Sequence, residues 1–169
     1  MAVLEIVKYP HPVLAKRCEE VRRIDGEVKK LIQDMIETMY QASGIGLAAC
    51  QVGVSQKIMV VDVSPMDAEQ DLFALINPEV VHEEGEVESE EGCLSVPDCV
   101  EKLARKTKIR VRGLTREGKE IEVAAEGILA IALQHEIDHL NGVLILDRIS
   151  RLKREIYRDK LKKEKRKEK

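Results

Sequence analysis

Apolar residues recur at the three- and four-residue spacing of an amphipathic helix in several parts of the chain. The first run begins after Asp25, a plausible N-cap, and ends at Ser43-Gly44. Its apolar positions are Val28, Leu31, Ile32, Met35, Ile36 and Met39. A second run covers 128–140 without a breaker and is closed by Asn141-Gly142. A third helix is predicted for 149–161, and its packed side would be formed by Ile149, Leu152 and Ile156.

The middle of the chain changes to the shorter period of β-strands. Residues 58–63 and 72–76 are short apolar runs, and Asn77-Pro78 is expected to stop the second. Residues 109–112 and 121–123 alternate around a turn-like segment, which predicts a hairpin with one solvated face. We therefore predict an α+β domain, with central antiparallel or mixed strands between an N-terminal and a C-terminal helix, rather than a doubly wound parallel sheet.

Length and composition favour one cytoplasmic domain. A chain of 169 residues with 44% apolar content can build a single core. The N-terminus carries Glu5 where a signal peptide has a longer apolar run, and no apolar stretch of membrane-spanning length occurs, so no membrane association is expected. In that compartment the four cysteines should stay reduced, and Cys18 and Cys99 are interpreted as small buried hydrophobic residues.

Charge is distributed unevenly along the chain. Residues 148–169 hold 12 Lys and Arg against 4 Asp and Glu, which is a charge of +8, and residues 1–147 carry −11. We therefore separate a body, 1–147, from a basic C-terminal helix or tail, 148–169. Such a tail is most often only a solvated end, but it also suits a polyanionic partner.

The sharpest chemical signal is His135-Glu136-Ile137-Asp138-His139 in the second long helix. Histidines four residues apart project from one helix face and can bind one metal at adjacent positions. Glu136 could reach a water activated by that metal without being a ligand, as a general base for hydrolysis must. The competing explanation is a chance match, expected on the order of once in a hundred such sequences. The strands would then pack around a metal-binding helix.

A catalytic metal usually has three protein ligands, so two histidines leave the site incomplete. No further His follows His139, and the downstream carboxylates lie near or in the basic tail: Asp147, Glu155 and Asp159. Upstream, Cys93 stands between Gly92 and Pro97 in an expected loop or strand end. We therefore predict Cys93 as the third ligand.

Residues 44–53 complete a set of three motifs. Alone, their paired glycines indicate only a helix stop and a tight turn. Together, Gly44-Ile45-Gly46-Leu47-Ala48-Ala49-Cys50-Gln51, Glu91-Gly92-Cys93-Leu94-Ser95 and the 135–139 segment resemble the three signature motifs of peptide deformylases, GxGLAAxQ, EGCLS and HExDH. The resemblance covers the chain from the first helix through residue 148.

The resemblance implies a metal-dependent hydrolase that removes the formyl group from the N-terminal formyl-methionine of nascent polypeptides and releases formate. Its metal ligands would be Cys93, His135 and His139. The implied metal is Fe²⁺, and one thiolate with two imidazoles also accepts Zn²⁺, Ni²⁺ or Co²⁺. A C-terminal helix is the ribosome contact in some members, so we expect the basic tail to bind the ribosome near the exit tunnel.

The resemblance also implies the remaining site residues. Glu136 would act as general base and acid, while Gln51 and the backbone N–H of Leu94 would stabilise the oxyanion. Gly46 would hydrogen-bond the substrate backbone. The slot for the methionine side chain would be lined, with Leu94, by Ile45, Ile128, Ile131 and Ala132. The chain departs from the family pattern at two positions, with Cys50 where Pro is common and Val100 near where many members carry Arg.

Two other functions fit parts of the sequence. A zinc endopeptidase would use His135, His139 and a downstream carboxylate, and would tolerate loss of Cys93. A non-catalytic ribosome-binding or RNA-binding module would use the metal only for structure, although structural sites usually have four protein ligands and three are found.

Overall fold

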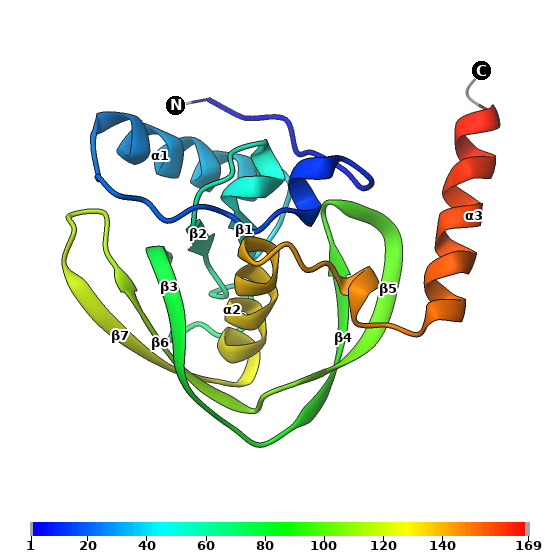
Figure 1. Ribbon diagram of the computed structural model, residues 1–169. Coiled ribbons are helices and arrows are strands. Elements are labelled where there is room, and N and C mark those ends of the chain that lie inside the picture. The colour runs from blue at the N-terminus through cyan, green and yellow to red at the C-terminus, as the bar shows by residue number, and fades with distance from the viewer. Residues whose placement is uncertain (1, 168–169) are drawn as a thin grey trace.

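The computed structural model describes residues 2–167, which form an α+β domain as predicted (Figure 1). The α-helices are α1 (Gly26–Gln41), α2 (Gly127–Leu140) and α3 (Arg151–Lys167). The strands are β1 (Gly46–Ala48), β2 (Ile58–Val61), β3 (Phe73–Glu84), β4 (Val87–Cys93), β5 (Val96–Arg105), β6 (Lys108–Leu114) and β7 (Glu120–Glu126). Short 3-10 helices are η1 (Pro12–Ala15), η2 (Ala49–Val52) and η3 (Ile145–Asp147). Among the described residues, no helix is long and apolar enough to span a membrane.

The main sheet is covered on both faces. It is antiparallel, with the strand order β1-β2-β3-β6-β7. Alternate residues of β2 enter different clusters: Met59 packs with the apolar face of α2, and Val60 packs with that of α1. Because side chains of a strand alternate between faces, burial on both sides requires an uninterrupted apolar run, which is what 58–61 shows.

The second sheet, β4–β5, is one end of a bent two-stranded ribbon. β3 pairs with β6 and β4 pairs with β5, and the short connections 85–86 and 106–107 join the two pairs. Gly85 has φ +73° at this bend, where a side chain would also meet Thr107. Figure 1 shows the ribbon as a V, with α2 between the arm formed by β3, β6 and β7 and the arm formed by β4 and β5. The histidine-bearing helix is thereby placed against the end of β4.

Several predicted boundaries are confirmed. Asp25 caps α1 by accepting a hydrogen bond from the backbone N–H of Val28 at 3.0 Å. Helix α2 ends at Leu140 with Asn141 as its C-cap, and Gly142 follows with φ +76°. The predicted hairpin is β6–β7, and alternate residues of β6 are exposed.

The prediction that Asn77-Pro78 stops a strand is wrong, because β3 continues through both residues. The pairing register shifts between Ile76 and Glu79, and Asn77 has φ +53°, so the two residues form a bulge rather than an end. The Asn77 side chain exchanges two hydrogen bonds, of 2.8 and 2.9 Å, with the backbone of Val21. These bonds stabilise the bulge from outside the sheet.

Helix α3 is longer than predicted and packs through a different face. Ile149 contacts the body as expected, but Leu152 and Ile156 are 68% and 60% exposed, so their predicted packing is wrong. Tyr157 is buried instead, and its hydroxyl donates a 2.7 Å hydrogen bond to the carbonyl of Pro97 in β5. The aromatic ring offers more apolar area than Leu or Ile and brings a polar group that β5 satisfies. Residues 168–169 of the predicted tail lie outside the described residues.

Candidate metal centre and active site

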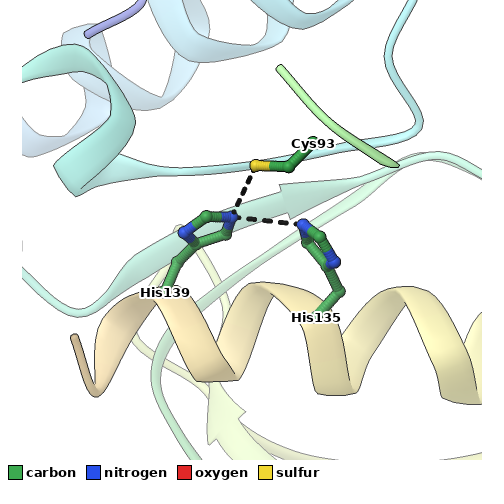
Figure 2. A group of neighbouring side chains, drawn as sticks. All are labelled: Cys93, His135 and His139. Atoms are coloured by element: carbon green, nitrogen blue, oxygen red, sulfur yellow. Dashed lines mark hydrogen bonds between the residues drawn. The ribbon is translucent and has the colours of Figure 1, made fainter. Parts of the chain in front are cut away.

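The three predicted metal ligands lie together where β4 meets α2 (Figure 2). One turn of α2 separates His135 from His139, so both imidazoles leave the same helix face. Their Nε2 atoms are 3.2 Å apart, and Cys93 Sγ is 3.3 Å from Nε2 of His139. All three ligand atoms lie within 4.8 Å of one another, which is close enough for one ion.

The chemistry of these groups fits a divalent transition metal. Burial holds the pKa of His139 well below its usual value, so its imidazole is neutral and able to donate a lone pair. Burial also lowers the pKa of His135, but hydrogen bonds with Cys93 and Glu91 raise it to about 10. A bound metal would displace that proton. One sulfur and two nitrogen donors suit Fe²⁺, Zn²⁺, Ni²⁺ or Co²⁺.

A buried ion network fixes the orientation of His135. Its Nδ1 lies 2.9 Å from Glu91, which accepts two hydrogen bonds from Arg105 at 2.7 and 2.8 Å. Arg105 also donates to Asp138 at 2.6 Å, and Arg148 contacts the same carboxylate. Burial raises the pKa of Glu91, but Arg105 and His135 outweigh burial and hold it at about 2. The network therefore directs Nε2 of His135 toward Cys93 and His139.

Glu136 is a second buried carboxylate of the site. It is 4% exposed, and within the described residues its Oε1 has no hydrogen-bond partner. Burial is the main cause that raises its pKa to about 7. A side chain on Gly46 would overlap with the Glu136 carboxylate, so this close approach requires glycine at position 46.

The Gln51 amide has a fixed orientation beside the ligands. Its Oε1 accepts a 2.9 Å hydrogen bond from the backbone N–H of Ala48. The amide nitrogen therefore faces the other way, 3.2 Å from Ser95 Oγ and 3.8 Å from Cys93 Sγ. An N–H donor is thus directed toward the ligand cluster, as an oxyanion contact requires.

A cavity of about 510 Å³ opens beside these groups. Its lining includes each residue predicted for substrate binding: Ile45, Gly46, Leu94, Ile128, Ile131 and Ala132. Of the two departures from the motif, Val100 also lines the cavity, whereas Cys50 is fully buried with its thiol 3.4 Å from the carbonyl of His139. Cys50 is therefore a core residue, as its small size predicts.

Sequence reasoning did not assign the ion network around Glu91, Arg105 and Asp138. Glu91 stands two residues before Cys93 and Asp138 stands directly before His139, and that proximity to a ligand was the available signal. Arg105 carries no such signal, because it approaches the site only through the pairing of β5 with β4.

Comparison with known proteins agrees with this geometry. Residues 3–155 match the family model described as polypeptide deformylase. The chain is 58% identical over 162 residues to a peptide deformylase of Thermodesulfovibrio yellowstonii, covering 96% of this chain and 98% of the relative.

Solved structures give the same result. A peptide deformylase from Legionella pneumophila has a TM-score of 0.91 and 44% identity, covering 99% of this chain and 98% of that one. The enzyme from Ehrlichia chaffeensis in complex with actinonin has a TM-score of 0.92 and 41% identity, covering 98% and 99%. The chain therefore belongs to the polypeptide deformylase family, whose members are metal-dependent hydrolases that remove the formyl group from the N-terminus of new proteins.

Proposed function

We propose that the chain deformylates N-terminal formyl-methionine with Cys93, His135 and His139 as metal ligands and Glu136 as the proton carrier. The observation that carries this assignment is the position of a buried carboxylate, whose Oε1 has no hydrogen-bond partner in the described chain, beside three ligand atoms within 4.8 Å of one another. The apolar cavity next to them is large enough for a methionine side chain.

The bound metal would be Fe²⁺, with Zn²⁺, Ni²⁺ or Co²⁺ as functional substitutes. It would supply a Lewis acid that polarises the formyl carbonyl and makes water a stronger nucleophile at neutral pH. The mixed sulfur and nitrogen donor set supports this range of ions and excludes the oxygen-preferring Mg²⁺ and Ca²⁺.

Glu136 takes the proton from the attacking water and gives it to the leaving amine. Burial raises the pKa of this carboxylate and so favours its protonated form, which helps a group that acts first as base to hold the proton until it acts as acid. Gly46 keeps the space beside this carboxylate free of a side chain.

Gln51 and Leu94 stabilise the negative charge that develops on the formyl oxygen. The Gln51 amide is already oriented by Ala48, so its N–H₂ group needs no reorganisation during the reaction. Leu94 follows Cys93 directly, which brings its backbone N–H close to the same point. The slot for the methionine side chain is formed by Ile45, Leu94, Ile128, Ile131 and Ala132.

The first test is Glu136→Gln. Formate release from a formyl-Met peptide should fall about 10³-fold, while metal content is retained, because the amide keeps the shape of the side chain but cannot accept the proton. Glu126→Gln is the matched control, since Glu126 precedes the same helix and is 74% exposed. Wild-type turnover in Glu136→Gln would remove Glu136 from the mechanism.

Cys93→Ala separates this proposal from the zinc endopeptidase alternative. Loss of the thiolate should abolish metal retention and activity here, whereas an endopeptidase with a downstream carboxylate ligand would tolerate the change. Metal analysis of the purified variant distinguishes the two outcomes.

We also propose that residues 148–169 bind the cytoplasmic ribosome near its exit tunnel. Tyr157 fixes α3 to β5, which leaves basic side chains exposed along the helix: Arg151, Lys153, Arg158, Lys160, Lys162 and Lys163. Such a surface suits RNA phosphate, and its affinity should fall with salt. Deletion of residues 162–169 should weaken ribosome co-sedimentation while leaving hydrolysis of a short formyl-Met peptide unchanged. Undiminished co-sedimentation would show that the far tail is only a solubilising end.

A further inference from the structure

Two of the most exposed apolar side chains in the described chain line the active-site cavity. Met66 is 65% exposed and Val100 is 61% exposed, and both belong to the cavity that contains Glu136. The residues proposed for the methionine slot are less exposed, so Met66 and Val100 lie at the mouth. Large apolar side chains left in water at a binding cavity indicate a surface that a ligand covers.

The segment that presents Met66 is held by specific hydrogen bonds. Met66 lies in a turn whose backbone N–H groups, from Met66 and Asp67, both donate to the carbonyl of Val63 at 2.9 Å. At the base of this turn Asp62 accepts hydrogen bonds from the Ser64 backbone at 2.9 Å and the Tyr40 hydroxyl at 2.5 Å. Met66 is therefore positioned by the fold, although its side chain is in solvent.

The charged residues around the mouth limit which substrate side chains can bind there. The cavity lining includes the carboxylates of Glu90 and Asp98, and among residues 2–167 no Lys or Arg lines it. Val100 adds no polar group. A substrate side chain at the mouth would make apolar contacts with Met66 and Val100. No Lys or Arg of the cavity lining would donate a hydrogen bond to it.

We propose that Met66 and Val100 form an apolar clamp that binds the side chain of the residue after the formyl-methionine, and that the clamp makes the enzyme prefer an apolar residue at this second position. The inference rests on the proposed function, because it assigns the deeper slot to methionine. The peptide leaves that slot through the mouth, where the next side chain meets both residues. Burial of about 40 Å² of apolar surface there corresponds to a preference of about fivefold.

Two near-isosteric peptides test the clamp. Formyl-Met-Leu-Ser and formyl-Met-Asn-Ser differ in the polarity of the second side chain and little in its size. The wild-type kcat/KM should be about fivefold higher for the Leu peptide, with the difference in KM. In the double variant Met66→Ser/Val100→Ser the two values should agree within about twofold. Val3→Ser is the matched control, because Val3 is 53% exposed and does not line the cavity, and it should keep the wild-type ratio.

Formyl-Met-amide separates failure of the clamp from failure of the proposed function. Formyl-Met-amide has no second side chain, so the kcat/KM of each peptide is divided by the kcat/KM of this compound. Formate release from formyl-Met-amide by the wild type, combined with equal rates on the Leu and Asn peptides, would overturn the clamp alone. A Leu preference that persists in the double variant would also overturn it. No formate from formyl-Met-amide or from either peptide would contradict the proposed function itself.

Discussion

The two hairpins β4–β5 and β6–β7 have the same antiparallel pairing, but the buried positions of their first strands differ in polarity. In β6 the inward residues Ile109 and Val111 are buried against the cluster that contains α2, while Arg110 faces solvent. In β4 the buried positions are Ser89 and Glu91. One hairpin is stabilised by apolar burial, and the other has polar groups in the place where an apolar residue would normally pack.

The difference follows from what each hairpin faces. β6–β7 covers the core, whereas β4 lies beside the metal ligands and the cavity, where its Glu91 holds His135 and Arg105. The apolar burial of the β4–β5 hairpin comes from β5, through Val96, Cys99 and Leu103. A strand that positions a site therefore gives up apolar burial at those positions and depends there on complete ion pairing. Substitutions in the two hairpins should separate these two sources of stability.

Loss of Arg105 from β5 should have the largest effect. Arg105→Met keeps apolar volume but leaves the buried Glu91 carboxylate without its main partner, which should cost about 3 to 5 kcal/mol of unfolding free energy. Because Glu91 also orients His135, metal affinity should fall about 10- to 100-fold. Urea unfolding and metal titration measure both effects. A loss of stability below about 1 kcal/mol would show that the network contributes little.

Acid should weaken the β4–β5 hairpin through Glu91. Its pKa in the folded chain is about 2, below the usual 4.5, so its contribution is fully present above pH 4.5 and is lost as pH falls from 4.5 toward 2. The full contribution is about 3 kcal/mol. Unfolding of the wild type and of Glu91→Gln should be compared at each pH between 7 and 3. The stability difference between the two proteins should shrink with acid, and a constant difference would contradict the assignment.

A small cavity in the β6–β7 hairpin should reduce stability without touching the chemistry. Ile109 is 2% exposed in the cluster with α2, and Ile109→Val removes one methylene group there. The expected loss is about 1 kcal/mol of unfolding free energy. Metal content and kcat/KM on a formyl-Met peptide should remain at wild-type values. A matching fall in activity would show that β6 also positions the site.

The exposed ion pairs of β6–β7 should contribute least. Arg110 lies 3.4 Å from Glu122, and both side chains are about half exposed. Arg110→Met should therefore change the unfolding free energy by about 0.2 to 1 kcal/mol, and added salt should remove most of that change. The same Arg→Met substitution at position 105 provides the direct comparison, since only that ion pair is buried.

The parts that the sequence predicted are those with a regular pattern or a fixed local spacing. The helix of His135 and His139 follows from helical periodicity, and its one-turn spacing brings both rings to one face. β4 and β5 were not predicted, because buried Ser89 and Glu91 remove the alternation that would show a strand. The face of α3 was misjudged because periodicity does not tell which apolar stripe meets the body, and contact with β5 selected Tyr157.

The bent ribbon also has a consequence for the order in which the chain folds. Pairing that begins at the turn between Cys93 and Val96 would continue to Val87 and Arg105 and then cross the bend to β3 and β6. Each new pair encloses only a few more residues than the last, so the entropy cost of closing the next loop stays small. Helix α2 comes later in the chain and packs mainly against β1, β2 and β7. We therefore expect the Cys93 turn to close early, and the two histidines to arrive at a thiol that is already in place.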